Sequence, residues 1–192
     1  MEIQDARREH AKALAHLINL AGEGLPEYLW RDMAEGDESP MAVGERRAAR
    51  QEGGFSYTNA RVCLRGDEVL GALVAYRQPD PFIIDDIDTF PAIIRPLLEL
   101  ESLAPGSFYI NALATAEDHR RQGVATALLK DALARGRSWG CASSSLIVAS
   151  ENTEATALYQ TAAFAPVAAR PVVPFEGHRH GGEWILLVKP LL

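Results

Sequence analysis

One stretch decides how this chain folds: Asn111-Ala112-Leu113-Ala114-Thr115-Ala116-Glu117-Asp118-His119-Arg120-Arg121-Gln122-Gly123-Val124-Ala125. Residues 107–110, just before it, are mostly aromatic and β-branched, a composition typical of a strand. From residue 126 to residue 139, apolar side chains repeat at helical spacing, which predicts an amphipathic helix. The stretch therefore contains a short polar turn between a strand and a helix.

This turn has the chemistry of an anion-binding site. A helix N-terminus carries unpaired N–H groups and partial positive charge, and Gly123 at its entrance lets a ligand approach the backbone closely. Arg120 and Arg121 add two full charges, so the turn is expected to bind a pyrophosphate. The alternative is a tight turn with two solvated arginines. Neither Gly-x-Gly-x-x-Gly nor Gly-Lys-Ser/Thr is present, so nucleotide-binding loops of those two types are excluded.

The motif Arg120-x-x-Gly123-x-Ala125 resembles the acyl-coenzyme A loop of the GNAT N-acetyltransferase superfamily. Leu113-Ala114-Thr115 is similar to the Leu-Ala-Val of the splayed strand that binds pantetheine in that family. A second family motif follows at the expected spacing, on Val148, Asn152, Ala155, Leu158, Tyr159 and Phe164. Ala163 departs from the pattern, since the family usually has glycine there, and we expect a slightly different turn without loss of coenzyme binding. The resemblance covers roughly residues 107–164.

The resemblance implies a single α/β domain over residues 1–192, with a mixed, mostly antiparallel central sheet flanked by helices. It also implies transfer of an acetyl group from acetyl-coenzyme A to a primary amine by direct attack, without a metal or a covalent acyl-enzyme. The absence of a Gly-x-Ser-x-Gly elbow agrees with direct attack. Two alternatives stay open: a non-catalytic acyl-coenzyme A sensor or scaffold, and a toxin-like or ribosome-associated enzyme that acetylates a macromolecule.

The same resemblance assigns the site residues. It implies coenzyme contacts from Leu113, Ala114, Thr115, Arg120, Arg121, Gln122, Gly123, Val124, Ala125, Asn152 and Tyr159. Tyr159 is also the expected catalytic acid, because a tyrosine hydroxyl can protonate the departing thiolate; the alternative is a packed ring. Acceptor contacts are expected from Glu23, Glu27, Tyr28, Trp30, Tyr109 and Asn111, with core packing as the alternative for Tyr28 and Trp30. No general base is identified, since residues 107–115 contain no carboxylate and Tyr109 or Asn111 could only hold a water.

The remaining chain reads as alternating strands and helices. Strands are expected at residues 1–5, 57–64, 69–76, 143–149, 164–173 and 183–188, with hairpins joining the second to the third and the fifth to the sixth. Helices are expected at residues 11–21, 26–33, 42–52 and 92–100, and a further helix is expected after Asn152, which is a plausible cap. Pro96 is expected to kink the helix at 92–100.

Residues 79–105 are too long for a hairpin loop and are expected to be functional or to form a partner surface. Asp85, Asp86 and Asp88 lie in this insertion and could attract a cationic acceptor, or form a solvated face. His178-Arg179-His180 offers two potential metal ligands, but without a third ligand a surface loop is the better interpretation.

Composition limits the partners. The chain has 192 residues, 47% of them hydrophobic, and a net charge of −7 at pH 7, which argues against nucleic-acid binding. Cys63 and Cys141 lie in apolar stretches and predict no disulfide framework. The sequence shows no leader and no apolar run near 18 residues, so a soluble cytoplasmic protein is expected, away from membranes. The expected partner is a small amine or a protein or peptide acceptor, and a homodimer is left open.

Overall fold

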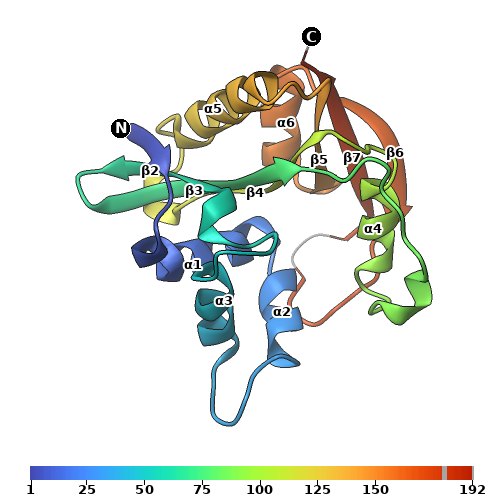
Figure 1. Ribbon diagram of the computed structural model, residues 1–192, viewed down its shortest axis with the longest axis horizontal. Coiled ribbons are helices and arrows are strands. Elements are labelled where there is room, and N and C mark those ends of the chain that lie inside the picture. The colour runs from blue at the N-terminus through green and yellow to red at the C-terminus, as the bar shows by residue number, and fades with distance from the viewer. Residues whose placement is uncertain (179–180, 192) are drawn as a thin grey trace. The chain divides into compact units, whose positions relative to one another are not determined.

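The computed structural model describes residues 1–178 and 181–191, and within them the strands form one seven-stranded mixed sheet in the order β1-β2-β3-β4-β5-β7-β6 (Figure 1). The strands are β1 (Glu2–Asp5), β2 (Ala60–Arg65), β3 (Glu68–Arg77), β4 (Phe108–Thr115), β5 (Ser143–Ala149), β6 (Ala165–Pro171) and β7 (Glu183–Pro190). The helices are α1 (Ala11–Ala21), α2 (Leu25–Arg31), α3 (Pro40–Ala48), α4 (Arg95–Glu101), α5 (Val124–Ser138) and α6 (Thr153–Thr161). β4 pairs with β5 in parallel over Phe108–Ile110, and β1–β2, β2–β3, β5–β7 and β6–β7 are antiparallel. The predicted fold class is confirmed.

The chain divides into two compact units, the first made of residues 1–76 and 111–132, the second of the remainder. In the first unit, strand side chains alternate between two faces. Val62, Val74 and Ala114 point to the face where Leu14 of α1 and Val43 of α3 complete a hydrophobic core. Helices α1 and α3 therefore cover one face of this unit's strands (Figure 1).

The opposite face of the first unit carries an ion pair. Arg61, which follows the alternation to this side of β2, donates through Nε to Asp131 Oδ2 of α5 at 2.9 Å and contacts Asp5 of β1 at 3.0 Å. These ion pairs fix the first half of α5 on the strands. They therefore help to position the polar turn that precedes α5.

In the second unit, Leu100 of α4 and Ala104 pack with Ala149 of β5 and with Trp184 and Leu186 of β7. The helix α4 thus contributes its apolar side to the unit's core, although it belongs to the long insertion. Arg170 of β6 pairs with Glu99 of α4. The insertion is therefore anchored by packing and by charge.

Three details of the sequence-based predictions were wrong: the bounds of the third helix, the start of the second strand and the kink at Pro96. α3 begins at Pro40 because the Ser39 hydroxyl accepts a hydrogen bond from Ala42 N at 3.2 Å, and it ends at Ala48 rather than at residue 52. The Ser56 hydroxyl likewise caps a 3-10 turn at Tyr57–Asn59, which delays β2 to Ala60. Pro96 does not kink a helix; it lies in the first turn of α4, where its missing N–H costs nothing.

Candidate functional site

The polar turn of the first unit is held by two contacts with the β2–β3 hairpin. His119 Nε2 lies 2.9 Å from Glu68 Oε1, and Arg65 Nη2 donates to Gln122 Oε1 at 2.9 Å. Arg65 and Glu68 flank the hairpin turn. The hairpin therefore positions the turn between β4 and α5.

The backbone of this turn presents a row of unused donors. Within the described chain, the N–H groups of residues 122–126 have no hydrogen-bond partner, and we call these five groups the amide cluster. Gly123 adopts φ +82°, and a Cβ there would meet nothing within 4 Å, so the space in front of it is open. Arg120, half exposed, is only loosely paired with Glu117 at 3.8 Å. Free amides, a helix N-terminus and a half-exposed cation together suit an anionic phosphate group.

Gly71 of β3 lets the elements of this site approach one another. A Cβ on Gly71 would lie 2.7 Å from the Ala114 carbonyl oxygen and 2.7 Å from Val124 Cγ1. Any side chain at this position would push the end of β4 and the start of α5 away from β3. Sequence reasoning did not identify Gly71, although an isolated glycine inside a strand pattern is a signal of close backbone approach.

Tyr159, in the second unit, has a buried ring and an available hydroxyl. Its ring lies edge-on to Phe164, with centroids 5.9 Å apart, and burial raises the pKa of the phenol to about 12. The hydroxyl has no hydrogen-bond partner among residues 1–178 and 181–191. A phenol of this kind stays protonated at neutral pH and has a proton to donate.

A Schellman motif fixes the end of α6 next to this tyrosine. Phe164 N donates to Tyr159 O at 3.0 Å and Ala163 N donates to Gln160 O at 2.9 Å, with Ala163 at φ +62°. Ala163 therefore adopts the left-handed conformation that glycine takes most easily. At the other end, Asn152 caps the helix by accepting from Ala155 N at 3.1 Å. The predicted cap is confirmed.

The structure places a carboxylate that sequence reasoning missed, Glu101, beside β4. Its two oxygens accept from the Tyr109 hydroxyl at 3.1 Å and from Gln78 Nε2 at 3.2 Å. Burial raises the pKa of Glu101 above its ordinary value, and these two hydrogen bonds only partly offset that effect. No cation neutralises Glu101 within the described residues. Uncharged donors and a raised pKa are typical of a proton acceptor.

The predicted acceptor residues occupy different environments. Glu27 is tied to Asn19, which donates to its carboxylate and accepts from its backbone, each at 3.0 Å. Tyr28 is partly buried and lies under the Arg31 guanidinium. Asn111 donates to the Tyr76 hydroxyl at 3.4 Å. Trp30 is 2% exposed, and a Cβ on Gly44 would overlap its ring at 2.3 Å, so the packing interpretation accounts for Trp30.

The predicted site residues are divided between the two units. The first unit holds Leu113, Ala114, Thr115, Asn111 and residues 120–125, together with Glu23, Glu27, Tyr28 and Trp30. The second unit holds Tyr109, Asn152 and Tyr159, together with Glu101. No cluster of potential metal ligands occurs in the described ranges 1–178 and 181–191. His178 stacks on Phe175 at 4.4 Å between centroids, while Arg179 and His180 lie outside the described residues.

Comparison with known proteins identifies the family. The model of the acetyltransferase (GNAT) family matches residues 23–164, which include the amide cluster, Glu101 and Tyr159. The chain belongs to the GNAT acetyltransferase family. It is therefore an acyltransferase, and its family catalyses acetyl transfer.

Solved GNAT structures share the fold of this acetyltransferase at low identity. An N-acetyltransferase from Staphylococcus aureus Mu50 is 18% identical over 98% of this chain and 100% of that chain, with a TM-score of 0.66. The polyamine N-acetyltransferase of Drosophila melanogaster, which forms N-acetylagmatine, is 13% identical over 98% and 99%, with a TM-score of 0.69. The ribosomal-protein-S18-alanine N-acetyltransferase of Escherichia coli is 16% identical over 99% and 93%, with a TM-score of 0.61. These likenesses show the fold.

No curated protein sequence matches this acetyltransferase. Among the described helices, none combines the length and apolarity needed to cross a membrane.

Proposed function

We propose that this enzyme transfers the acetyl group of acetyl-coenzyme A to the primary amine of a small cationic acceptor. The amide cluster carries the proposal for the donor, because five unused N–H groups at a helix N-terminus suit the pyrophosphate of the coenzyme. The insertion supports a cationic acceptor, since residues 79–105 contain six acidic residues and one arginine, a net charge of −5.

We assign a role in the proposed transfer to several groups of this chain. The backbone N–H groups of residues 113–115 polarise the thioester carbonyl, as donors aimed at developing negative charge do in other acyl transfers. The amine nitrogen forms a bond to the carbonyl carbon, and the carbon–sulfur bond breaks. An ammonium acceptor must first lose one proton to solvent to become a nucleophile. A second proton then leaves its nitrogen as the amide forms, and one proton must reach the sulfur.

Glu101 accepts the proton of the amine in this proposal. A carboxylate with a raised pKa is a better base near neutral pH than an ordinary glutamate. The hydrogen bonds from Tyr109 and Gln78 orient its oxygens and favour its ionised form. In this proposal Tyr109 holds a carboxylate, whereas the sequence alone suggested a water held by Tyr109 or Asn111.

Tyr159 donates the proton that reaches the sulfur of the departing thiolate. Its hydroxyl is not engaged with other described residues, and its pKa of about 12 keeps it protonated. The same raised pKa makes it a weak acid, so the proton moves as negative charge builds on the sulfur.

The test is a turnover screen of the purified protein with acetyl-coenzyme A and a panel of primary amines. Mass spectrometry should detect an acetylated amine and free coenzyme A in equal amounts. Calorimetry on the same protein measures coenzyme binding separately. Binding without any product across small amines, peptide N-termini and ribosomal proteins would favour a coenzyme sensor, and absence of binding would exclude the amide cluster as the coenzyme site.

A further inference from the structure

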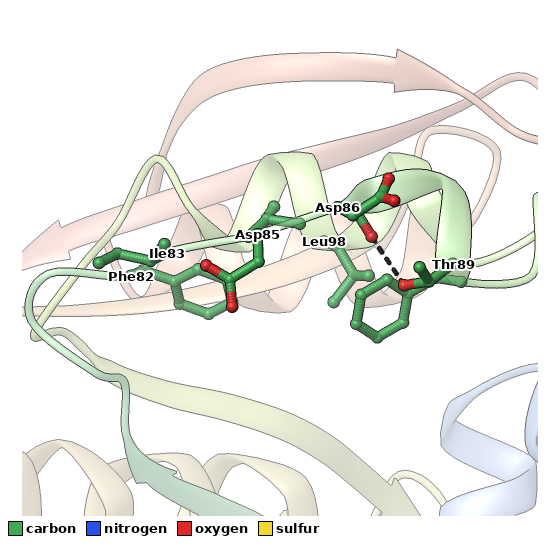
Figure 2. Close-up of a pocket in the computed structure, with 8 residues that line it drawn as sticks. Phe82, Ile83, Asp85, Asp86, Thr89 and Leu98 are labelled. Atoms are coloured by element: carbon green, nitrogen blue, oxygen red, sulfur yellow. Dashed lines mark hydrogen bonds between the residues drawn. The ribbon is translucent and has the colours of Figure 1, made fainter.

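The insertion of the second unit contains a pocket that the proposed chemistry does not use. Its volume is about 390 Å³, a size that suits a small organic ligand. Its apolar lining consists of Phe82, Ile83, Ile84, Phe90 and Leu98, and its polar lining of Asp85, Asp86 and Thr89 (Figure 2). The pocket is thus an apolar hollow with carboxylates on its wall.

Two of the three neighbouring aspartates are occupied by the local fold. Asp86 caps the 3-10 turn at Ile87–Thr89 by accepting from Asp88 N at 3.0 Å, and its carbonyl accepts from the Thr89 hydroxyl at 2.7 Å (Figure 2). Asp88 is bound by Arg95 through its side chain and its carbonyl. These contacts build the wall of the pocket.

Asp85 has no such structural task. In the part of the chain that the structure describes, its carboxylate has no hydrogen bond and no ion pair. It lies on the pocket wall (Figure 2). The one arginine in the sequence of the insertion, Arg95, is already bound to Asp88. Asp85 is exposed, so it is a solvent-facing charge at the edge of an apolar surface, and it attracts cations through screened electrostatic interactions.

Two apolar side chains of the pocket wall are exposed to solvent. Ile83 is 70% exposed and Phe90 is 39% exposed, within a segment that is otherwise acidic. Covering such a cluster with an apolar ligand body removes apolar surface from water, which favours binding. The pocket therefore favours an occupant that is apolar along its body and positively charged at one end.

The geometry points to this pocket as the binding site for the apolar body of a cationic primary amine, with Asp85 attracting its ammonium group. This inference rests on the proposed function, because it names the class of acceptor. Leu98 of the pocket and Glu101 are three residues apart on α4, so they are neighbours along one side of that helix. An amine held against Leu98 would have the proposed proton acceptor on the next turn.

Binding of two matched probes separates the two parts of the site. The first is 2-phenylethylamine, and the second is 2-phenylethanol, which lacks the charge. Calorimetry is done on the full-length protein with and without saturating coenzyme A. We expect the amine to bind more tightly than the alcohol, and Asp85→Asn to weaken only the amine, about 3- to 10-fold. Leu98→Ala should weaken both probes.

Asp67→Asn, in the turn between β2 and β3, is the matched control for loss of one surface charge and should change neither affinity. Tighter binding of putrescine, a cation without an apolar ring, than of 2-phenylethylamine would overturn the inference. So would an unchanged amine affinity in Asp85→Asn.

Turnover distinguishes a failure of this inference from a failure of the proposed function. Acetylation of other amines, without binding or acetylation of 2-phenylethylamine, would overturn the pocket assignment and leave acetyl transfer standing. Asp85-dependent binding of 2-phenylethylamine, without acetylation of any amine, would support the pocket and remove the proposed reaction.

Discussion

Glu101 shows how a single side chain acquires a chemical role from its surroundings. Two residues before it on α4, Glu99 is paired with Arg170, and it has the usual role of a surface carboxylate. Glu101 instead faces the uncharged donors of Tyr109 and Gln78, and its pKa is raised. The two glutamates have the same chemistry and differ in their burial and in their partners, and burial is what raises the pKa of Glu101.

Glu101→Gln should therefore lower kcat by about 10²- to 10⁴-fold, the usual contribution of a general base. The melting temperature should hold or rise, because glutamine removes the cost of burying a charge. The control is Glu99→Gln, which should keep kcat near the wild-type value. The measurement is kcat against pH, and the wild-type acid limb should disappear in Glu101→Gln. A wild-type kcat in that variant would return Glu101 to a structural role.

Tyr159→Phe is the corresponding test of the proton donor. The substitution keeps the ring that packs on Phe164 and removes only the hydroxyl oxygen. We expect kcat to fall about 10- to 1,000-fold, with little change in coenzyme affinity. The rate must be measured where chemistry limits turnover. Equal rates in the two proteins would mean that the thiolate receives its proton from another group.

At the scale of elements, α5 has a positive-φ glycine before its first turn and another after its last turn. Gly123 precedes the helix with φ +82°, Gly140 follows it with φ +70°, and a Cβ at either would meet nothing within 4 Å. The two positions carry similar backbone strain for other residues. Only Gly123 belongs to the amide cluster.

Gly123→Asp should weaken binding of acetyl-coenzyme A by about 10- to 100-fold, because it adds negative charge where the free amides and Arg120 form the proposed phosphate site. Gly140→Asp should lower the melting temperature by a similar amount and leave coenzyme affinity unchanged. Calorimetry on both folded variants shows whether backbone strain or the added charge causes the loss of coenzyme affinity. Equal losses of affinity in the two variants would contradict the proposed coenzyme site.

The end of α6 allows a stabilising substitution. Ala163 occupies the left-handed position of the Schellman motif, which costs a residue with a Cβ about 1 kcal/mol relative to glycine. Ala163→Gly should raise the melting temperature by about 2–4 °C for a chain of this length. Ala157→Gly, on an exposed position inside the same helix, should lower it. Calorimetric scans of both variants test the sign, and a destabilised Ala163→Gly would show that this turn is not strained.

At the scale of the whole molecule, Tyr159 links burial to the pH dependence of unfolding. Its folded pKa of about 12 lies above its ordinary value of 10.0. The contribution of Tyr159 to the free energy of unfolding is therefore fully present below pH 10, and it is lost as the pH rises toward 12. At pH 11, the wild type should have lost about 1.4 kcal/mol relative to Tyr159→Phe.

Urea titrations of both proteins at pH 9 and pH 11 measure that difference, since other titrating groups affect the two proteins alike. A constant difference between the two pH values would show that the phenol is not desolvated in the folded state.

The local elements of this protein could be predicted from its sequence. Apolar periodicity placed α1 and β5 at their observed bounds, and Asn152 was recognised as a helix cap. The strand–turn–helix with Gly123 was predicted because caps, turns and helix N-termini depend on residues within a few positions of one another. The family motifs lie in the same local segments. Errors arose where such a local signal was overlooked, as with the Ser39 cap of α3 and with Pro96 in the first turn of α4.

Contacts between distant elements were decided only by the tertiary structure. Glu101 and Tyr109 lie on a helix and a strand whose approach no periodicity specifies, and Gly71 meets the Ala114 carbonyl 43 positions later in the chain. The sequence of Trp30 and its neighbours is compatible with binding and with packing alike. The contact of the Trp30 ring with Gly44, which the tertiary structure creates, favours packing. A hydrophobic pattern states which face of an element is buried, but not which element covers it. The partner, and with it the pKa and the role of a side chain, follows from how the faces pack.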